Sequence, residues 1–290
     1  MTMSKPQKLK TRFAPSPTGY LHLGHAYSAY LAYDYARAHN GEFVLRIEDI
    51  DQTRCKPEYI TAIYDDLRWL GLEWSNDVRI QSEHLEDYIA AMNRLKEIDV
   101  IYPCFCSRSD IQKEISESAN APHGPEGPLY PGTCKKLTSE QKQAQIRAGK
   151  NYALRLDAKK ASDHLKQKNT WPLLWRDAIN GPQQVNPETF GDVVLARKDT
   201  PTSYHLSVTV DDALQNITHI TRGEDLFEAT HIHRLLQALL DLPTPLYNHH
   251  PLLLDEKGKR FAKRDNAKTL QHLRKNGITV QEVRAMCDLP

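Results

Sequence analysis

The chain has 290 residues, 40% of them hydrophobic and 26% charged, which is the balance of a globular protein with a sizeable core and one or two smaller modules. No apolar run is long enough to cross a membrane, and the polar, basic residues 1–10 lack the apolar stretch of a signal peptide, so we expect a cytoplasmic protein with no membrane partner. A net charge of +1 neither requires nor excludes a nucleic-acid partner, and five unevenly spaced cysteines argue against a disulfide framework.

The first third of the chain alternates short apolar strands with amphipathic helices. A Pro/Gly segment, PSPTG at 15–19, ends the first strand and precedes the first helix. Strands are predicted at 10–14 and 43–47, and helices at 26–35, 60–70 and 85–95. This alternation predicts an α/β fold with a largely parallel sheet.

Breaker residues interrupt the alternation in the middle of the chain. Four prolines and three glycines within residues 119–132 predict a loop, and the polar residues 135–190 are interpreted as an inserted subdomain. The alternation then returns with a candidate strand at 217–221 and a strong helix at 226–240. A segment rich in Lys and Arg, 255–268, precedes a short helical tail.

Two histidines near the start of the first helix form a candidate phosphate site. The string RFAPSPTGYLHLGH places His22 and His25 three residues apart, so that both imidazoles lie on one face of the first turn. A helix N-terminus offers free N–H groups to an anion, and Gly24 permits close approach to the backbone. A bare pair of histidines is more often an ordinary surface feature, but a long motif after a strand and a turn is far more specific.

A second candidate piece of the nucleotide site lies near the end of the chain. Residues 257–264 read KGKRFAKR, and their cations can neutralise charge that develops at the α-phosphate and the leaving pyrophosphate of ATP. Such a charge run alone is usually a solvated loop. Its pairing with the histidine motif favours a functional interpretation.

Both motifs resemble the signatures of class I aminoacyl-tRNA synthetases. RFAPSPTGYLHLGH resembles the HIGH motif in its glutamyl-enzyme form, and RFAKR at 260–264 stands where that class has its KMSKS loop. The resemblance covers the chain from about Thr11 to about Lys268 and implies a Rossmann-type catalytic sheet, ATP as a substrate and Mg²⁺ bound with it. It gives catalytic roles to His22, His25 and Lys263, and contact with ATP to these three residues and Gly24.

Charged and polar residues at the expected strand ends form a candidate amino-acid site. The segments RFAPSPTG, RIEDID, YHLSVTVDD and THITRGED match those with which the glutamyl enzymes hold L-glutamate. An arginine fork suits a carboxylate and rejects uncharged glutamine. Taken singly, Glu48 fits a structural pair with Arg46 equally well, while Arg222 fits an exposed strand end and Tyr204 a core. The resemblance assigns glutamate contact to Arg12, Ala14, Ser16, Glu48, Tyr204 and Arg222.

Three cysteines form a candidate metal site. Cys104, Cys106 and Cys134 supply three sulfurs, and Zn²⁺ prefers four ligands. By ligand preference the fourth is His123, and three free thiols are the alternative without a metal. The CxC and YxxxC patterns resemble the zinc site of glutamyl-queuosine tRNA(Asp) synthetases, in which a tyrosine completes the set. By that resemblance Tyr130 is the fourth ligand of one structural Zn²⁺.

The part of the chain after the lysine loop is short. Only 26 residues follow Arg264, where full glutamyl- and glutaminyl-tRNA synthetases carry a large anticodon-binding region, so we expect a catalytic domain alone. Together with the cysteine pattern, this favours the glutamyl-queuosine family. That family implies tRNA-independent activation of glutamate and its transfer to the cyclopentene-diol of queuosine at the wobble position of tRNA(Asp). The alternatives are a shortened glutamyl-tRNA synthetase that charges the 3′ end of tRNA(Glu), a non-catalytic tRNA-binding paralogue, and a small-molecule nucleotidyltransferase.

These motifs divide the chain into five expected segments. Two of them, 1–103 and 191–254, are the halves of the catalytic core. Between them lie a zinc-binding insertion, 104–134, and a connecting, acceptor-like subdomain, 135–190. The last segment, 255–290, holds the KMSKS-like loop and the helical tail.

Overall fold

The structure is a computed structural model that describes residues 8–75, 77–117, 123–124, 127–253 and 269–290. The predicted lysine loop, Lys263 included, lies outside the described residues. Among the helices that are described, none has both the length and the apolar character needed to span a membrane.

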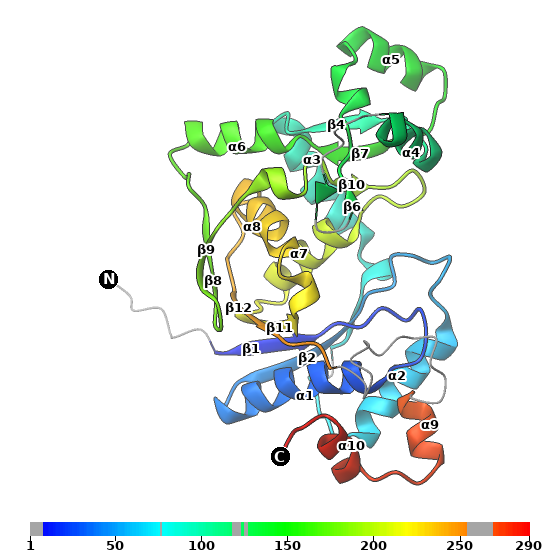
Figure 1. Ribbon diagram of the computed structural model, residues 1–290, viewed down its shortest axis with the longest axis vertical. Helices are drawn as coiled ribbons and strands as arrows, with labels where there is room; N and C mark the ends of the chain where they lie inside the picture. Colours follow the sequence, from blue (N-terminus) through cyan, green and yellow to red (C-terminus); the bar gives the residue numbers. More distant parts are fainter. Residues whose placement is uncertain (1–7, 76, 118–122, 125–126, 254–268) are drawn as a thin grey trace.

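The N-terminal part folds as alternating parallel strands and helices. Strand β1 (Lys10–Phe13) pairs in parallel with β2 (Glu42–Ile47), and β2 pairs in parallel with β3 (Arg79–Ile80). Helices α1 (Leu23–Ala38) and α2 (Pro57–Trp69) connect them, and α1 lies along one face of the strands (Figure 1). Consecutive residues of β1 and β2 are buried, as expected for parallel strands covered on both faces.

The second half of the sheet continues beside β1. Strand β11 (His219–Gly223) pairs in parallel with β12 (Leu246–His250), and α8 (Ala229–Leu239) connects the two. The backbone N–H of Thr218 donates to the carbonyl of Lys10 at 3.0 Å, so β11 starts beside β1. The order β3-β2-β1 followed by β11-β12 is that of a Rossmann fold, with its switch point between β1 and β11. The predicted parallel α/β fold is confirmed.

A hairpin from residues 135–190 extends the same sheet. Strand β8 (Leu174–Asp177) pairs with β12 through Asp177 and Tyr247, and β9 (Gly181–Gln184) runs antiparallel to β8. The expected connecting subdomain therefore contributes strands to the layer formed by β11 and β12. The short, mixed sequence of this hairpin carries no signal of that docking, because its partner strand lies far along the chain.

A separate antiparallel sheet lies above the Rossmann layer and carries the cysteines (Figure 1). Its order is β10-β7-β4, formed by Val194–Ala196, Ala153–Leu156 and Ile101–Cys104. Around it lie α4 (Arg108–Glu117), α5 (Ser139–Arg147) and α6 (Ala158–Gln167), and a two-residue hairpin of β5 (His123–Gly124) and β6 (Gly127–Pro128). Strand β10 pairs here although it falls within the segment expected to be the second half of the core, and the five-segment division remains a prediction.

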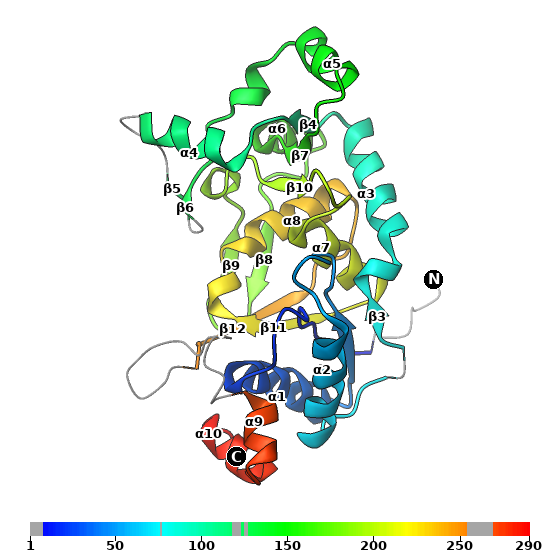
Figure 2. The same ribbon diagram turned by 90° about the vertical axis from the view of Figure 1, so that its right-hand side faces the viewer.

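Four further α-helices belong to the described fold. Helix α3 (Leu85–Glu97) and helix α7 (Tyr204–Leu214) lie between the two sheets, and one apolar cluster joins α3, β7, α7 and α8. The tail forms α9 (Leu270–Lys275) and α10 (Val280–Met286), which lie against α1 and α2 (Figure 2).

Candidate active site and metal centre

A cavity of about 520 Å³ opens where β1, β2 and β11 end. This is the position at which Rossmann-type sheets bind ligands, because the chain diverges to opposite sides at the switch point. Residues from β1, α1, α7 and β11 line it together with Glu48, which directly follows β2. Every predicted ATP or glutamate residue that the structure describes lines this cavity: Arg12, Ala14, Ser16, His22, Gly24, His25, Glu48, Tyr204 and Arg222.

The start of α1 forms one wall of the cavity. His22 is the N-cap residue, and its backbone N–H donates to Nδ1 of His25 at 3.1 Å. The centroids of the two imidazole rings are 3.8 Å apart. The His22 ring also lies against Gly24, where a Cβ atom would come within 3.2 Å of Cε1. The two imidazoles and the first N–H groups of the helix thus face one space, an arrangement that suits phosphate oxygens.

A buried network of charges forms the floor beneath β1 and β2. Arg12 Nε and Arg46 Nη1 both donate to Oδ1 of Asp212, at 3.1 and 2.9 Å. Burial raises the pKa of Asp212, but Arg12 and Arg46 outweigh burial and hold it below its ordinary value. Arg46 Nη2 also donates to Oε1 of Glu48 at 3.1 Å. The structural pairing of Glu48 with Arg46 is therefore present, and Glu48 lines the cavity as well.

Arg222, in β11, carries a buried positive charge whose protein partners are neutral. Its Nε donates to Nε2 of His249 at 3.1 Å and its Nη1 to Nδ1 of His233 at 3.3 Å. Its Nη2 donates to Oγ1 of Thr230 at 2.6 Å and to the carbonyl of Leu226 at 3.2 Å. Only 5% of Arg222 is exposed, and no carboxylate of the described residues pairs with it. A buried charge without a counter-ion is costly, so an anionic ligand is stabilised here, and Arg222 is no surface residue.

An acid–imidazole pair behind Arg222 was not identified from the sequence. Asp177 Oδ2 accepts from His249 Nδ1 at 2.8 Å, and both side chains are fully buried. With its proton held on Nδ1, His249 presents the Nε2 lone pair to Arg222. Burial, with help from Arg222, lowers the pKa of His249 to about 4, so the imidazole is neutral near pH 7. The histidine pair at 249–250 after an apolar run was the available signal, but nothing local linked it to Asp177.

Tyr204 begins α7 and points a phenol at the cavity. It is half-buried, and its hydroxyl makes no hydrogen bond to any residue that the structure describes. Burial raises the pKa of Tyr204, which keeps the phenol protonated and able to donate. Tyr204 therefore lies at the wall of the cavity and not in the apolar core, which was the alternative interpretation.

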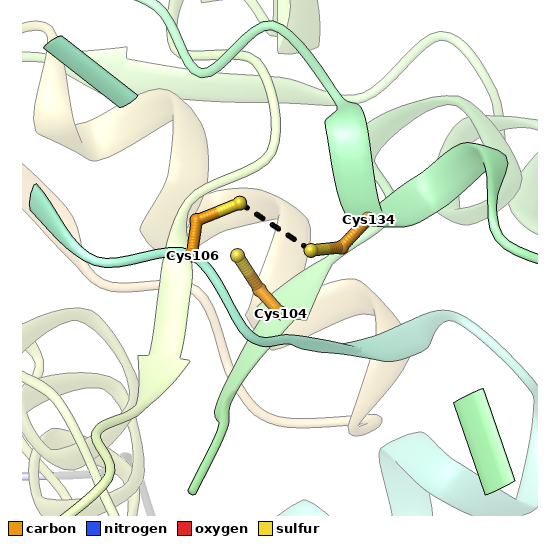
Figure 3. A group of neighbouring side chains, drawn as sticks. All are labelled: Cys104, Cys106 and Cys134. Atoms are coloured by element: carbon orange, nitrogen blue, oxygen red, sulfur yellow. Dashed lines mark hydrogen bonds between the residues drawn. The ribbon is translucent and has the colours of Figure 1, made fainter. Parts of the chain in front are cut away.

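The three cysteines lie together at the antiparallel sheet. Cys104 ends β4, Cys106 follows it, and Cys134 lies in a short 3-10 helix, η2 (Thr133–Lys136). Their Sγ atoms all lie within 4.8 Å of one another, and those of Cys106 and Cys134 are 3.4 Å apart (Figure 3). These three residues form a possible metal site.

Tyr130 directs its hydroxyl at the same point. Its Oη lies 3.4 Å from Sγ of Cys104 and 3.6 Å from Sγ of Cys106, and it accepts from the backbone N–H of Cys134 at 2.8 Å. The guanidinium of Arg155 lies 3.9 Å from the centre of the Tyr130 ring, and burial, together with the contact with Cys104, raises the pKa of the Tyr130 phenol. Three sulfurs and one oxygen match the number of ligands that Zn²⁺ takes. The side chain of His123 lies outside what the structure describes.

Thiol pKa values at this cluster show what a cation would change. Burial raises the pKa of Cys106 to about 12. At Cys134 burial also raises the pKa, but hydrogen bonds from Tyr130 and from the backbone N–H of Phe105 bring it below its ordinary value. A bound divalent cation would favour the thiolate at each position, because thiolates are the ligands it takes.

Known proteins match the chain over most of its length. The model of the family of class I tRNA synthetase (E and Q) catalytic domains matches residues 8–288. The glutamyl-Q tRNA(Asp) synthetase of Rhodobacter capsulatus is 49% identical over 284 residues, which cover 96% of this chain and 99% of that protein. The protein of the same name from Symbiobacterium thermophilum is 42% identical, over 94% of this chain and 83% of that protein.

Glutamate–tRNA ligases also match, over about half of their length. That of Aquifex aeolicus is 39% identical, over 93% of this chain and 54% of that protein. Among solved structures, the glutamate-tRNA synthetase of Elizabethkingia anophelis superposes with a TM-score of 0.74 at 28% identity. It covers 90% of this chain and 54% of that one.

Proposed function

The chain belongs to the class I tRNA synthetases with an E and Q catalytic domain and is an aminoacyl-tRNA ligase of that family, and we propose a specific reaction for it. It uses ATP to activate L-glutamate without tRNA, and it then transfers the glutamate to the cyclopentene-diol of queuosine at the wobble position of tRNA(Asp). The observation that carries the amino-acid choice is the buried Arg222, which has no protein counter-ion among the described residues.

Charge balance supports glutamate as the amino acid. Arg12 and Arg46 are matched by Asp212 and Glu48, whereas Arg222 is left with neutral partners. Glutamate has one net negative charge, and its side-chain carboxylate fits the free N–H of the Arg222 fork. Glu48 and Arg12 also line the cavity, so Glu48 is available to the ammonium group, and Arg12, Ser16 and the Tyr204 phenol are available to the α-carboxylate. Glutamine would leave the arginine without its counter-ion.

The activation step follows from the position of the histidine motif. An oxygen of the α-carboxylate attacks the α-phosphorus of ATP in line, which forms glutamyl-adenylate and releases pyrophosphate. His22, His25 and the N–H groups of α1 hold phosphate oxygens, and Lys263 stabilises the charge of the transition state. Mg²⁺ binds with ATP and screens its phosphates. Catalysis is positioning and electrostatics, with no covalent enzyme intermediate.

The transfer step takes glutamate from the mixed anhydride. A hydroxyl of the cyclopentene-diol attacks the activated carbonyl carbon, the ester forms, and AMP leaves with the bonding electron pair. The support for this acceptor is the name of relatives that the chain matches over 83% and 99% of their length, together with the cluster of Cys104, Cys106, Cys134 and Tyr130. In the proposed enzyme these four residues hold one structural Zn²⁺, which ties η2 to β4.

Transfer of radiolabelled glutamate tests the acceptor. We expect label on tRNA(Asp) that contains queuosine and none on queuosine-free tRNA(Asp) or on tRNA(Glu). The competing function is charging of tRNA(Glu) at its 3′ end, which the 39% identity to a glutamate–tRNA ligase favours. Label on tRNA(Glu) alone would establish that function instead.

Glutamate-dependent exchange of pyrophosphate into ATP tests the activation step. Lys263→Ala is expected to abolish exchange, and Arg222→Ala to raise the glutamate KM at least about 100-fold, since a buried charged hydrogen bond is lost. Arg234→Ala is the matched control, because its Nε donates to the Leu174 carbonyl outside the cavity. A normal glutamate dependence in Arg222→Ala would exclude the proposed pocket.

A further inference from the structure

A second cavity, of about 430 Å³, lies between α3 and the antiparallel sheet, apart from the active-site cavity. Its floor is apolar and is formed by helix α3, strands β7 and β10, and the end of α5. Its rim carries four cations from three separate segments of the chain: Lys96, Lys150, Arg197 and Lys198. None of the described residues that line it carries a carboxylate. We refer to it as the basic cavity.

The lysines of the rim are not neutralised by the protein. Lys96 Nζ donates to Oδ1 of Asn93 at 3.2 Å, Lys150 Nζ to Oε1 of Gln145 at 3.1 Å, and Lys198 Nζ to the carbonyl of Phe105 at 3.4 Å. None of the three forms an ion pair with another described residue. The exposed carboxylate of Asp110 lies near Lys150 and Lys198, and their charges add to the hydrogen bonds from Ser107 that lower its pKa. Because the whole chain has a net charge of only +1, this concentration of positive charge is local.

Two rim residues of the basic cavity contact segments next to the cysteine cluster and next to the active-site cavity. The carbonyl that Lys198 holds belongs to Phe105, between Cys104 and Cys106, and the ring of Tyr152 lies 5.6 Å from that of Phe105. On the other side Arg197 Nη1 lies 3.4 Å from Oδ2 of Asp51, in the loop that leaves β2 just after Glu48.

An apolar floor with a cationic rim is the combination that single-stranded nucleic acid requires. Cations follow the phosphates, while an apolar or aromatic surface receives an unstacked base. A free phosphate or an acidic peptide would use the rim but not the floor. We propose that the basic cavity holds an unpaired segment of the RNA substrate, with phosphates at Lys150 and Lys198 and one base over the floor. This inference rests on the proposed function, because it assumes an RNA acceptor.

Charge reversal at the rim tests the proposal. The double variant Lys150→Glu/Lys198→Glu is compared with the wild type and with Lys168→Glu, which makes the same kind of change at an exposed lysine beyond the end of α6, outside the cavity. Binding of fluorescently labelled tRNA(Asp) is measured by anisotropy across a salt series. We expect the double variant to raise Kd by at least about tenfold and to reduce the slope of log Kd against log salt by about 1.4, for two phosphates of single-stranded RNA. Lys168→Glu is expected to match the wild type.

Pyrophosphate exchange without tRNA separates the possible failures. It is expected to be unchanged in the double variant, which shows that the fold and the activation site are intact. If the wild type transfers glutamate to tRNA and the double variant does so with the same Kd, salt slope and kcat/KM, the basic cavity is not an RNA site and the proposed function stands. If the wild type neither binds nor charges any tRNA, the acceptor half of the proposed function and the present inference both fail.

Binding of a base to the floor is tested separately from binding of the phosphates. Inorganic tripolyphosphate and an unpaired oligoribonucleotide of equal charge are compared as competitors of labelled tRNA. The oligoribonucleotide is expected to compete at a concentration at least about tenfold lower, because a stacked base adds to the phosphate contacts. Equal competition by the two compounds would show that the basic cavity binds phosphates alone, and it would contradict the proposal that a base lies over the floor.

Discussion

The surroundings of Arg222 decide whether its positive charge is available to a ligand. The exposed Arg54 and Arg94 form ion pairs with carboxylates, whereas Arg222 is buried among neutral partners: His233, His249 and Thr230. Each neutral partner accepts one hydrogen bond and leaves the positive charge in place. The site is thus prepared for an anion before one arrives, which is the condition for strong electrostatic recognition. Asp177 acts indirectly, because it accepts a hydrogen bond from His249, which in turn accepts one from Arg222.

Asp177→Asn is expected to weaken glutamate binding without unfolding the protein. The amide can donate to His249 and so can place the imidazole proton on Nε2, which removes the acceptor for Arg222 Nε. We expect the glutamate KM to rise about tenfold, with the ATP KM unchanged, in pyrophosphate exchange. Asp163→Asn, at an exposed carboxylate of α6, is the control. An unaltered glutamate KM would show that Arg222 does not depend on the tautomer of His249.

Acid is expected to destabilise the site through its buried histidines. Burial, with help from Arg222, lowers the pKa of His205 and of His249 to about 4, and the pKa of His233 falls well below its ordinary value. In the unfolded chain these imidazoles titrate near about 6.5. The stability that they contribute is therefore complete above pH about 6.5 and is lost as the pH falls toward about 4, at up to about 1.4 kcal/mol per pH unit for each histidine.

Urea unfolding between pH 7 and pH 4 measures this loss. His249→Asn is expected to flatten the fall of the unfolding free energy, whereas His39→Asn, at an exposed histidine, is expected to leave it unchanged. Identical pH profiles for His249→Asn and the wild type would contradict a buried neutral His249.

At the scale of elements, each binding site lies where segments end. The start of α1, the ends of β1 and β2, and the start of α7 meet at the active-site cavity, because parallel strands direct their carboxyl ends to one edge. The end of β4 and the short helix η2 meet at the cysteine cluster. The cysteines lie in a small apolar cluster, formed by Tyr102, Cys104, Phe105 and Cys134 with half-buried neighbours, which is separate from the larger core beneath the antiparallel sheet. Such a small cluster gains much from a metal cross-link.

One bound zinc per chain is the expectation for the purified protein. Cys134→Ser is expected to abolish the zinc measured by elemental analysis and to lower Tm by several degrees. Cys55→Ser, at a cysteine outside the cluster, is expected to retain both. Tyr130→Phe separates the fourth ligand from the sulfurs and is expected to weaken zinc affinity while leaving some binding. Full zinc content and Tm in Cys134→Ser would exclude the proposed site.

At the scale of the whole molecule, the parts are joined by apolar packing and by a few long-range ion pairs. One apolar cluster includes Leu156 of the antiparallel sheet, Leu95 of α3 and Leu236 of α8, so the cysteine-bearing sheet and the Rossmann sheet share a core. The tail is attached differently. Arg274 of α9 lies 3.3 Å from the fully buried Asp66 of α2, and Arg284 of α10 lies 2.8 Å from Asp34 of α1.

Removing the arginine of the Asp66 pair is expected to loosen the tail. Burial raises the pKa of Asp66 to about 6, and Arg274 opposes that shift. Arg274→Ala leaves an uncompensated buried carboxylate and is expected to cost about 1–3 kcal/mol of unfolding free energy at pH 7. Because the carboxyl takes up a proton more readily when folded, the cost is expected to shrink below pH about 6. The double variant Asp66→Asn/Arg274→Ala is expected to recover much of the loss, and its failure to do so would contradict a charge effect.

Local patterns were enough to predict the parallel fold and to locate the histidine motif at a helix start, which the structure places at the wall of the cavity. The motif RFAPSPTGYLHLGH combines a strand end, a Pro/Gly turn and a helix start, and each depends on residues that are neighbours in the chain. Helical and strand periodicity located α1, α2, α3, α8, β1 and β2, since one buried face imposes a regular spacing. The glutamate residues came from a resemblance to known motifs, and the structure brings them to one cavity.

What the tertiary structure alone decided is which distant residues share one buried environment. The pairing of β8 with β12 places Asp177 beside His249, and the packing of α3 against β7 and β10 gathers Lys96, Lys150 and Lys198 around one cavity. Neither grouping has a signal in the chain, because periodicity and turn chemistry act over a few residues. Burial and charge balance are properties of the folded whole, and they determine that Arg222 has neutral partners whereas Arg46 is paired with acids.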